Sequence, residues 1–302
     1  MPLRIGTRGS ALALLQARSV ADALPVDAEL VPIRTSGDEG GAALGAGDDK
    51  SRFVREIERA LLDGEIDLAV HSAKDLPSEL PDGLAILGVS AREEPADAWV
   101  GPGRSLAEIP GGARVGTASL RRRAQLLALR PDLEVVELRG NVDTRLRRLG
   151  DGEFDGIVLA AAGLRRLGRG DEIAFRFGLD ELTPAAGQGA LALEGRVEGV
   201  AHIAPALAVT DGPSLVELTA ERAAVRGLGA SCRSPVGVCA RFLPEGGLRL
   251  VGFAGLADGS GHLLDAVSGD PEQPVALAES LVASMAEAGA LDLLARAEER
   301  GA

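Results

Sequence analysis

Lysine, histidine and cysteine are scarce in this chain of 302 residues, and long hydrophobic runs are missing. The two cysteines, Cys232 and Cys239, are too few to staple a chain of this size, and their spacing fits no common zinc-ligand pair. We therefore predict a reducing, cytoplasmic location. No apolar run approaches the roughly 18 residues that a membrane-spanning helix needs. Because a strand-like segment starts at Leu3, we also expect no signal peptide.

Several functional motifs are missing, and each absence removes a class of function. There is no phosphate-binding loop of the form GxxxxGK(S/T) and no GxGxxG after a predicted strand, so a nucleotide cofactor has no support. There is no GxSxG nucleophile elbow. The histidines His71, His202 and His262 are scattered and form no metal-ligand pattern, which favours structural or surface roles over metal binding.

The charge is acidic overall but basic in one segment. The formal net charge of −13 argues against a general affinity for nucleic acid or an anionic membrane. All basic residues except Lys50 and Lys74 are arginine, and the segment from Arg114 to Arg148 holds nine arginines against four acidic residues, a local charge of +5. Beyond a Debye length of about 8 Å the overall repulsion is screened, so this segment can still attract anions. Either a solvated basic face or an anion-binding surface fits it.

Short β-branched runs alternate with amphipathic stretches, a pattern typical of α/β layers with mainly parallel strands. The length favours two or three domains. Residues 36–51, rich in Gly, Ala and Asp, are predicted to form a long loop. Strands are predicted near 3–6, 67–71, 85–89, 113–116, 133–138, 156–160, 236–241 and 248–253, and helices near 11–24, 53–62, 214–227 and from 274 onward.

One strand-to-helix pattern occurs twice. Residues 5–7 are Ile-Gly-Thr and residues 115–117 are Val-Gly-Thr, and each is followed by a serine, Ser10 or Ser119. Such a turn places backbone amides and hydroxyls at a helix N-terminus, where anions bind well. Because arginines accompany both turns, we predict a cleft between two domains that holds carboxylates or phosphates.

The string from His71 to Pro77 follows a predicted strand, at the edge where open α/β sheets place their ligand sites. Asp75 is positioned there to hydrogen-bond an N–H group and to stabilise a developing cation. Equally, it can cap a turn beside a solvated Lys74.

The two cysteines differ in their surroundings. Cys232 lies in a predicted tight loop, with Arg233 available to favour a thiolate, whereas Cys239 lies in an apolar strand. If either sulfur is used, Cys232 is the candidate. Two structural cysteines remain the alternative.

These strings together resemble the porphobilinogen deaminase (hydroxymethylbilane synthase) family, in order and at familiar spacing over some 230 residues. The matching strings are GTRGS at 6–10, VHSAKDLP at 70–77, VGTASLRR at 115–122, LRGNVDTRL at 138–146, AGQGA at 186–190, and Glu221-Arg222 ahead of Cys232. The resemblance implies a transferase of tetrapyrrole (heme and porphyrin) biosynthesis. Such an enzyme joins four porphobilinogen molecules head to tail on a covalent dipyrromethane primer, releasing ammonia and then hydroxymethylbilane.

The resemblance also implies roles for individual residues. Cys232 would carry the dipyrromethane cofactor through a thioether bond. Asp75 would contact the pyrrole nitrogens, assist the loss of ammonia and stabilise the resulting azafulvene cation. The side chains implied to bind the cofactor are Ser72, Lys74, Thr117, Ser119, Arg121, Arg122, Arg145 and Gln188. Those implied to bind substrate are Arg8, Ser10, Lys50 and Arg139.

The chemistry of the substrate agrees with these roles. Each porphobilinogen carries an acetate and a propionate, so a growing chain crowds many carboxylates into one cleft. Arginine suits that demand, because its charge is permanent and its forked donors are directional. A single aspartate among many cations stays ionised and can face a developing positive charge.

The fold implied by the resemblance has three α/β domains. Residues 1–92 with 191–210 would form the lobe that carries Asp75, and 95–188 would form the arginine-rich lobe. Both lobes would resemble those of periplasmic binding proteins. Residues 213–302 would form a smaller α+β domain with Cys232. We expect a monomer whose partner is the small molecule porphobilinogen, with no nucleic acid and no membrane.

The chain departs from the family pattern in three places. Residues 230–231 are Ala-Ser where the family often has Gly-Gly, and alanine is strained if that turn needs a positive φ. In the loop, Lys50 matches the second of two family lysines, but Ala46 replaces the first and residues 51–52 are Ser-Arg instead of Gly-Leu. Ala118 replaces a frequent serine.

Two other functions stay open. A non-catalytic anion-binding protein would need the arginines and the Gly-Thr turns but neither Asp75 nor Cys232. A degenerate member of the family would fold without turning over substrate.

Overall fold

The computed structural model describes residues 1–34, 54–199, 204–231 and 234–301. Its contacts divide the chain into two compact units. Unit 1 comprises Met1–Glu93 and Gly189–Leu215, and unit 2 comprises Glu94–Gln188 and Val216–Ala302. The separation of 95–188 from 213–302 as two domains stays a prediction. The loop predicted at 36–51 lies outside the described residues.

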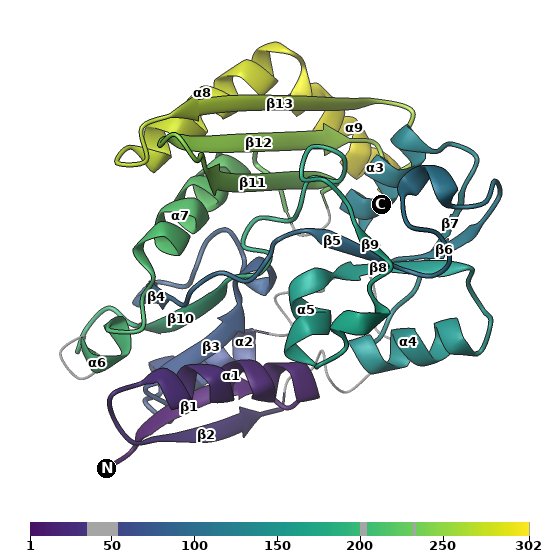
Figure 1. The fold of residues 1–302 in the computed structure, drawn as a ribbon. Helices are drawn as coiled ribbons and strands as arrows, with labels where there is room; N and C mark the ends of the chain where they lie inside the picture. Colours follow the sequence, from purple (N-terminus) through teal and green to yellow (C-terminus); the bar gives the residue numbers. More distant parts are fainter. Residues whose placement is uncertain (35–53, 200–203, 232–233, 302) are drawn as a thin grey trace. The chain divides into compact units, whose positions relative to one another are not determined.

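Unit 1 is built on a five-stranded sheet with the strand order β2-β1-β3-β10-β4 (Figure 1). Strands β1 and β3 run parallel, as predicted, and β2, which was not predicted, is parallel to β1, but β10 is antiparallel to both of its neighbours. Its elements are β1 (Leu3–Arg8), α1 (Ala11–Ala23), β2 (Ala28–Ile33), α2 (Arg55–Leu62), β3 (Leu68–Ser72), a 3-10 turn (Ala73–Asp75), β4 (Leu84–Val89), β10 (Leu191–Arg196) and α6 (Ala204–Leu207).

Successive residues of β3 point to opposite faces of the sheet, and a different helix covers each face. Leu68 and Val70 pack with Ile5 and Val20 in the cluster under α1. Ala69 packs instead in the cluster under α2. The position of a side chain along β1 or β3 therefore decides whether it lies on the face covered by α1 or on the face covered by α2.

Unit 2 contains a second five-stranded sheet, with the order β7-β6-β8-β5-β9. Strands β6, β7 and β8 are parallel, whereas β5 is antiparallel to β8 and β9. The elements of this part are β5 (Asp97–Val100), β6 (Arg114–Gly116), α3 (Leu120–Leu129), β7 (Glu134–Val136), α4 (Val142–Gly150), β8 (Gly156–Ala160), α5 (Ala161–Arg166) and β9 (Phe175–Arg176), with 3-10 turns at Leu106–Glu108 and Gly170–Glu172.

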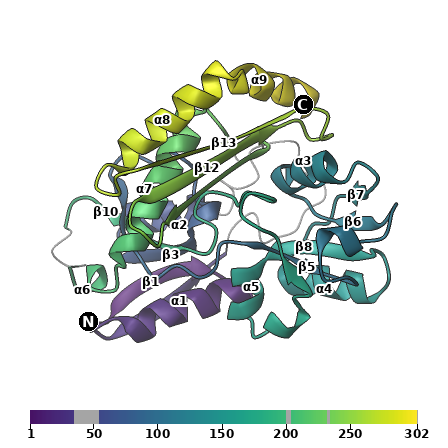
Figure 2. The ribbon, with the colours of Figure 1, turned by 45° about the horizontal axis from the view of Figure 1, so that its top comes forward.

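The third sheet, also in unit 2, is antiparallel with the order β11-β12-β13. Helices α8 and α9 lie along it (Figure 2) and share with α7 and the strands one apolar cluster that includes Leu250, Leu281 and Met285. The elements are α7 (Gly212–Gly227), β11 (Val236–Phe242), β12 (Leu248–Gly255), β13 (His262–Gly269), α8 (Pro274–Glu287) and α9 (Ala290–Gly301).

No single helix in the described part of the chain is long and apolar enough to cross a membrane, and the α8–α9 pair that reaches this length is bent by 74°.

The sheets and their helices confirm the predicted α/β class. The antiparallel strands β5 and β10 were not predicted.

The two Gly-Thr pairs, predicted as turns, lie in β1 and at the end of β6, and both have the same steric reason for their glycine. A Cβ atom on Gly6 would lie 2.2 Å from Ile66 Cδ1, and one on Gly116 would lie 2.7 Å from Leu138 Cδ2. The serine that follows caps the next helix in both units. Ser10 Oγ accepts the N–H of Ala13, and Ser119 Oγ accepts the N–H of Arg122.

We expect Gly156→Ala to destabilise unit 2 by about 1–3 kcal/mol through overpacking. The added Cβ would lie 2.1 Å from the ring of Trp99, which is fully buried and held by a 2.9 Å hydrogen bond from Nε1 to Pro102 O. Urea unfolding measures the change. Gly150→Ala is the control, since it meets no atom within 4 Å and should be neutral or slightly stabilising. Equal effects of the two substitutions would contradict this account.

Candidate active site

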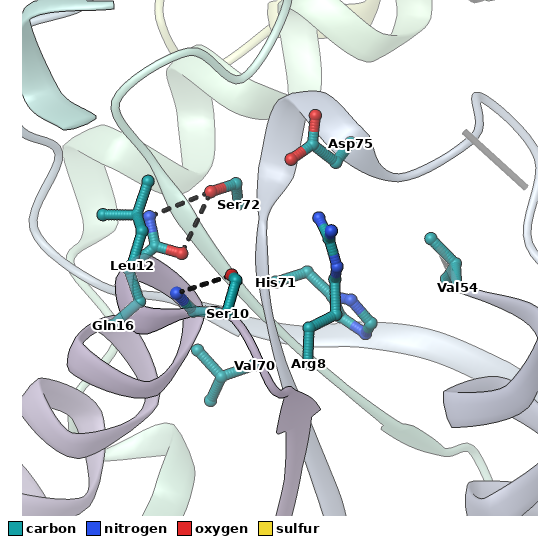
Figure 3. A pocket seen from close by; sticks show the side chains of 10 residues that line it. Arg8, Ser10, Leu12, Gln16, Val54, Val70, His71, Ser72 and Asp75 are labelled. Atoms are coloured by element: carbon teal, nitrogen blue, oxygen red, sulfur yellow. Dashed lines mark hydrogen bonds between the residues drawn. The ribbon is translucent and has the colours of Figure 1, made fainter. Parts of the chain in front are cut away.

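A pocket in unit 1 opens at the carboxyl ends of β1 and β3. Its polar lining comes from the end of each strand and from the first turns of α1, and Figure 3 shows these side chains. The lining residues are Arg8, Ser10, Leu12, Ala13, Gln16, Val54, Val70, His71, Ser72 and Asp75. The predicted residues Arg8, Ser10, Ser72 and Asp75 are thus brought together.

Short local structures place these groups. Arg8 is the last residue of β1, and Ser10 caps α1. Asp75 ends the 3-10 turn that follows β3, and its side chain is half-buried. In Figure 3 the Arg8 side chain extends from beside His71 toward Asp75. A cation and a carboxylate therefore line the same pocket next to a helix N-terminus, where anions are favoured.

Ser72 lies on the α1 side of the sheet and is already hydrogen-bonded within the protein. Gln16 Nε2 donates to Ser72 Oγ at 2.9 Å, and Ser72 Oγ lies 3.1 Å from Gln16 Oε1. Gln16 was not predicted as a site residue, because nothing in the sequence marks one glutamine on a helix. Lys74 lies in the same 3-10 turn as Asp75 but is not among the residues that line this pocket.

In unit 2 three of the predicted cofactor-binding residues, Arg121, Arg122 and Gln188, surround a buried aspartate that the sequence analysis missed. The Asp97 carboxylate is fully buried. Its Oδ1 accepts from Arg122 Nε at 3.0 Å, from Arg122 Nη2 at 2.7 Å and from Gln188 Nε2 at 2.8 Å. Its Oδ2 accepts from Arg121 Nη1 at 2.7 Å. Arg121 and Arg122 are each only 5% exposed.

The electrostatics of this network follow from burial. Burial alone would raise the pKa of Asp97, but the charges of Arg121 and Arg122 and their hydrogen bonds outweigh it and hold that pKa well below its usual value. Burial lowers the pKa of Arg121, and Asp97 opposes this change. One buried polar atom, Arg121 Nε, has no hydrogen-bond partner among the described residues, so a donor is left over at this position.

The polar groups at the start of α3 lie beside this network in sequence. Thr117 is buried, and its Oγ1 accepts the N–H of Ser119 at 3.2 Å. Arg139 is exposed and donates to Glu137 at 2.7 Å, and Arg145 donates to Gly140 O at 2.7 Å. The two hydroxyls and the two arginines are groups of the kind that bind carboxylates, as a dipyrromethane cofactor requires.

Two predicted residues, Cys232 and Lys50, lie outside the described residues. The described residues before Cys232 answer the question raised by Ala230. The positive φ of that turn, 62°, belongs to Gly229, and none of the described non-glycine residues has a positive φ. Alanine at position 230 is therefore not strained.

We expect Asp97→Asn to cost about 3–5 kcal/mol at pH 7, because it leaves two buried guanidinium groups without an anion. The folded-state pKa of Asp97 is depressed, so its contribution is present above the unfolded value near pH 4 and is lost as the pH falls below it. The difference from the wild type should therefore shrink in acid.

Urea unfolding between pH 7 and pH 3.5 measures this dependence. The control is Asp180→Asn, which breaks an exposed 2.8 Å pair with Arg249 and should cost under about 1 kcal/mol. A loss at Asp97 no larger than that of the control would show that the network is not structural.

Comparison with known proteins places the chain in a family. A family model described as "Porphobilinogen deaminase, dipyromethane cofactor binding domain" matches residues 3–202, and one described as "Porphobilinogen deaminase, C-terminal domain" matches residues 215–287. The relative from Thermus thermophilus is 46% identical, over 97% of this chain and 98% of that one. The relative from Deinococcus radiodurans is 45% identical, over 98% of each chain. Both are named porphobilinogen deaminase.

A solved periplasmic sulfonate-binding protein from Methylobacillus flagellatus is also similar, at 13% identity and a TM-score of 0.39, over 74% of this chain and 66% of that one.

The family comparisons confirm the resemblance that six short strings indicated, and they confirm the dipyrromethane cofactor expected from it at the level of the family. Since the family models together cover most of the sequence and the relatives match almost end to end, the chain belongs to the porphobilinogen deaminase family.

Proposed function

We propose that this chain catalyses the stepwise head-to-tail condensation of four porphobilinogen molecules, with release of ammonia and then of hydroxymethylbilane. The observation that carries the proposal is the Asp75 carboxylate, which lines one pocket together with Arg8 and Ser10. A carboxylate at that place can face the positive charge that develops when the substrate loses ammonia. The arginine and the helix N-terminus beside it suit the carboxylates of the same substrate.

The unit 1 residues divide the work between binding and chemistry. Arg8 offers a permanent, forked cation, and Ser10 a hydroxyl at the first turn of α1, for the acetate and propionate groups. Asp75 accepts a hydrogen bond from the pyrrole N–H and stabilises the cation left on the substrate. Ser72 ends β3 and Lys74 lies in the same 3-10 turn as Asp75. Substrate contacts by Lys50 and Arg139 remain part of this proposal.

Most of the residues proposed to hold the cofactor belong to unit 2. A dipyrromethane linked to the Cys232 sulfur would supply the pyrrole carbon to which the first porphobilinogen is joined, and each later unit would be joined to the ring added before it. Its carboxylates would meet donors of unit 2 that are fixed before binding, because Asp97 holds both guanidinium groups in place. The residues proposed for this role are Thr117, Ser119, Arg121, Arg122, Arg145 and Gln188 together with Ser72 and Lys74.

We also propose that the chain works as a monomer in the cytoplasm with porphobilinogen as its partner, without nucleic acid or membrane. The net charge of −13 supports the absence of a polyanionic partner.

Asp75→Ala should reduce turnover by roughly 100-fold or more, because no other group replaces the anion at the developing cation. The measurement is the formation of tetrapyrrole from porphobilinogen, detected as colour after oxidation. Asp82→Ala, at an exposed position of unit 1, is the matched control and should keep the wild-type rate. Unchanged turnover in the Asp75 variant would remove that residue from its proposed role.

Mass spectrometry of the intact protein tests the attachment separately. The wild type should carry one dipyrromethane on the peptide that contains Cys232, and Cys232→Ala should lack both the added mass and the activity. Cys239→Ala should keep both, since this side chain of β11 is only 2% exposed and offers no accessible thiol. An unmodified wild-type protein would favour the anion-binding alternative, and added mass without turnover would favour a degenerate enzyme.

A further inference from the structure

Three ionisable side chains are buried together on the α2 side of the unit 1 sheet. They are His71 of β3, Glu194 of β10 and Glu58 of α2, with exposures of 6%, 0% and 6%. His71 Nε2 lies 2.9 Å from Glu194 Oε2. Ionisable groups are seldom buried this deeply without a specific role.

The fold brings these groups to one place. His71 follows Ala69 by two residues in β3, so both point toward α2, and Ala69 is paired across the sheet with Glu194. The register between β10 and β4 shifts between Leu193 and Glu194, and such an irregularity re-aims a side chain. On α2, Glu58 follows the fully buried Ile57 and so lies at the edge of the apolar face.

The cluster contains more carboxylates than cations. Burial and the Glu194 carboxylate together raise the pKa of Glu58 to about 7, although His71 and Arg55 oppose this change. Four buried atoms, Glu58 Oε1, both Glu194 oxygens and His71 Nε2, lack hydrogen bonds of good geometry among the described residues. Below about pH 7 Glu58 therefore keeps its proton within this group of unsatisfied atoms.

Other charged groups near α2 come from the sheet and from the helix itself. They are Arg4 and Arg8 of β1, Glu29 of β2, Arg196 of β10, and Arg55, Glu56 and Arg59 of α2, whereas β4 supplies none. Arg4 pairs with Asp67 at 2.7 Å, and Arg196 lies 3.9 Å from the same carboxylate. The Asp67 carboxylate therefore balances one of these two cations.

The cluster adjoins the Asp75 pocket through His71, which lines that pocket together with Arg8. We propose that Glu58, Glu194 and His71 form one buried cluster that sets the charge beneath the pocket, and that they act as positioning residues for its anionic substrate. When Glu58 loses its proton, the cluster gains one negative charge. The identity of the substrate rests on the proposed function.

The protonation of Glu58 is measurable without activity. Infrared difference spectra of the whole protein between pH 5.5 and pH 8.5 should contain a protonated-carboxyl stretching band that disappears with a midpoint near 7. The band should be absent in Glu58→Gln and present in Glu65→Gln, which changes an exposed residue of the same unit. If Glu58→Gln does not fold, the wild-type and control spectra still decide whether a buried carboxyl titrates there.

The effect on the pocket is measurable in the kinetics. As the pH rises from 6 to 8.5, the KM for porphobilinogen should rise about four- to sixteenfold more in the wild type than in Glu58→Gln, as one charge at roughly 10 Å and an effective dielectric of about 20–40 gives. The substrate's own titration is the same for every variant, and Glu65→Gln should follow the wild type. The kcat should change less than KM, because Asp75 itself is unaltered.

Two results would overturn the proposal. One is the absence of a titrating carboxyl band in the wild type. The other is a pH dependence of KM that Glu58→Gln leaves unchanged, since the cluster would then not act on the pocket. A protein that shows the band but has no deaminase activity would contradict the proposed function instead, because the infrared result does not depend on the substrate.

Discussion

The candidate site depends on one constraint, which is that buried charges need buried partners. In unit 2 this constraint falls on Asp97. Its carboxylate accepts four hydrogen bonds from Arg121, Arg122 and Gln188, and no water reaches it. Without that anion, two like charges would face each other in a medium of low dielectric. The Asp97 side chain therefore holds together β5, helix α3 and the loop residue Gln188.

This arrangement limits the charge and the donors that the basic segment can offer to an anion. Counting charges along the sequence gives a local +5 between Arg114 and Arg148, which suggests freely available guanidinium groups. In the folded unit, Arg121 and Arg122 share the Asp97 carboxylate. The three side chains together therefore carry one net positive charge, and most of the N–H donors that face Asp97 are already used. Such groups bind less by attraction from a distance than by donors fixed in advance, which reduces the entropy lost when a ligand is held.

The sequence predicts local features of this protein better than its long-range pairings. Ser10 and Ser119 were expected at helix starts, and both cap helices, because a cap depends on the next three residues only. The parallel strands β1 and β3 were also expected. By contrast, the antiparallel strand β10 joins the unit 1 sheet from more than 100 residues further along the chain. The return of residues 191–210 to this lobe was expected only from the resemblance, and no local pattern predicts the strand or its direction.

The same limit explains the missed site residues. Asp97 lies in the run Ala96–Val100, where one acidic residue beside apolar neighbours is normally an exposed position of a strand. Only its pairing with two arginines 24 and 25 residues away explains why it is buried. Glu194 and Glu58 were missed for this reason as well, since their shared surroundings come from β10 and α2. Motifs identified the pocket residues, but not the charges that support them.

The supporting charges differ in kind between the two units, and this difference has a consequence. Unit 2 uses arginine against aspartate, so its charge is constant over the physiological range. Unit 1 uses histidine against two glutamates, and the pKa of Glu58 is raised to about 7. If the proton on Glu58 favours the binding of carboxylates in the pocket, thermodynamic linkage requires that bound carboxylates also make Glu58 hold this proton more tightly. The unit 1 cluster can therefore become less negative in response to an anionic ligand, whereas the unit 2 network cannot, so proton uptake on binding would originate in unit 1.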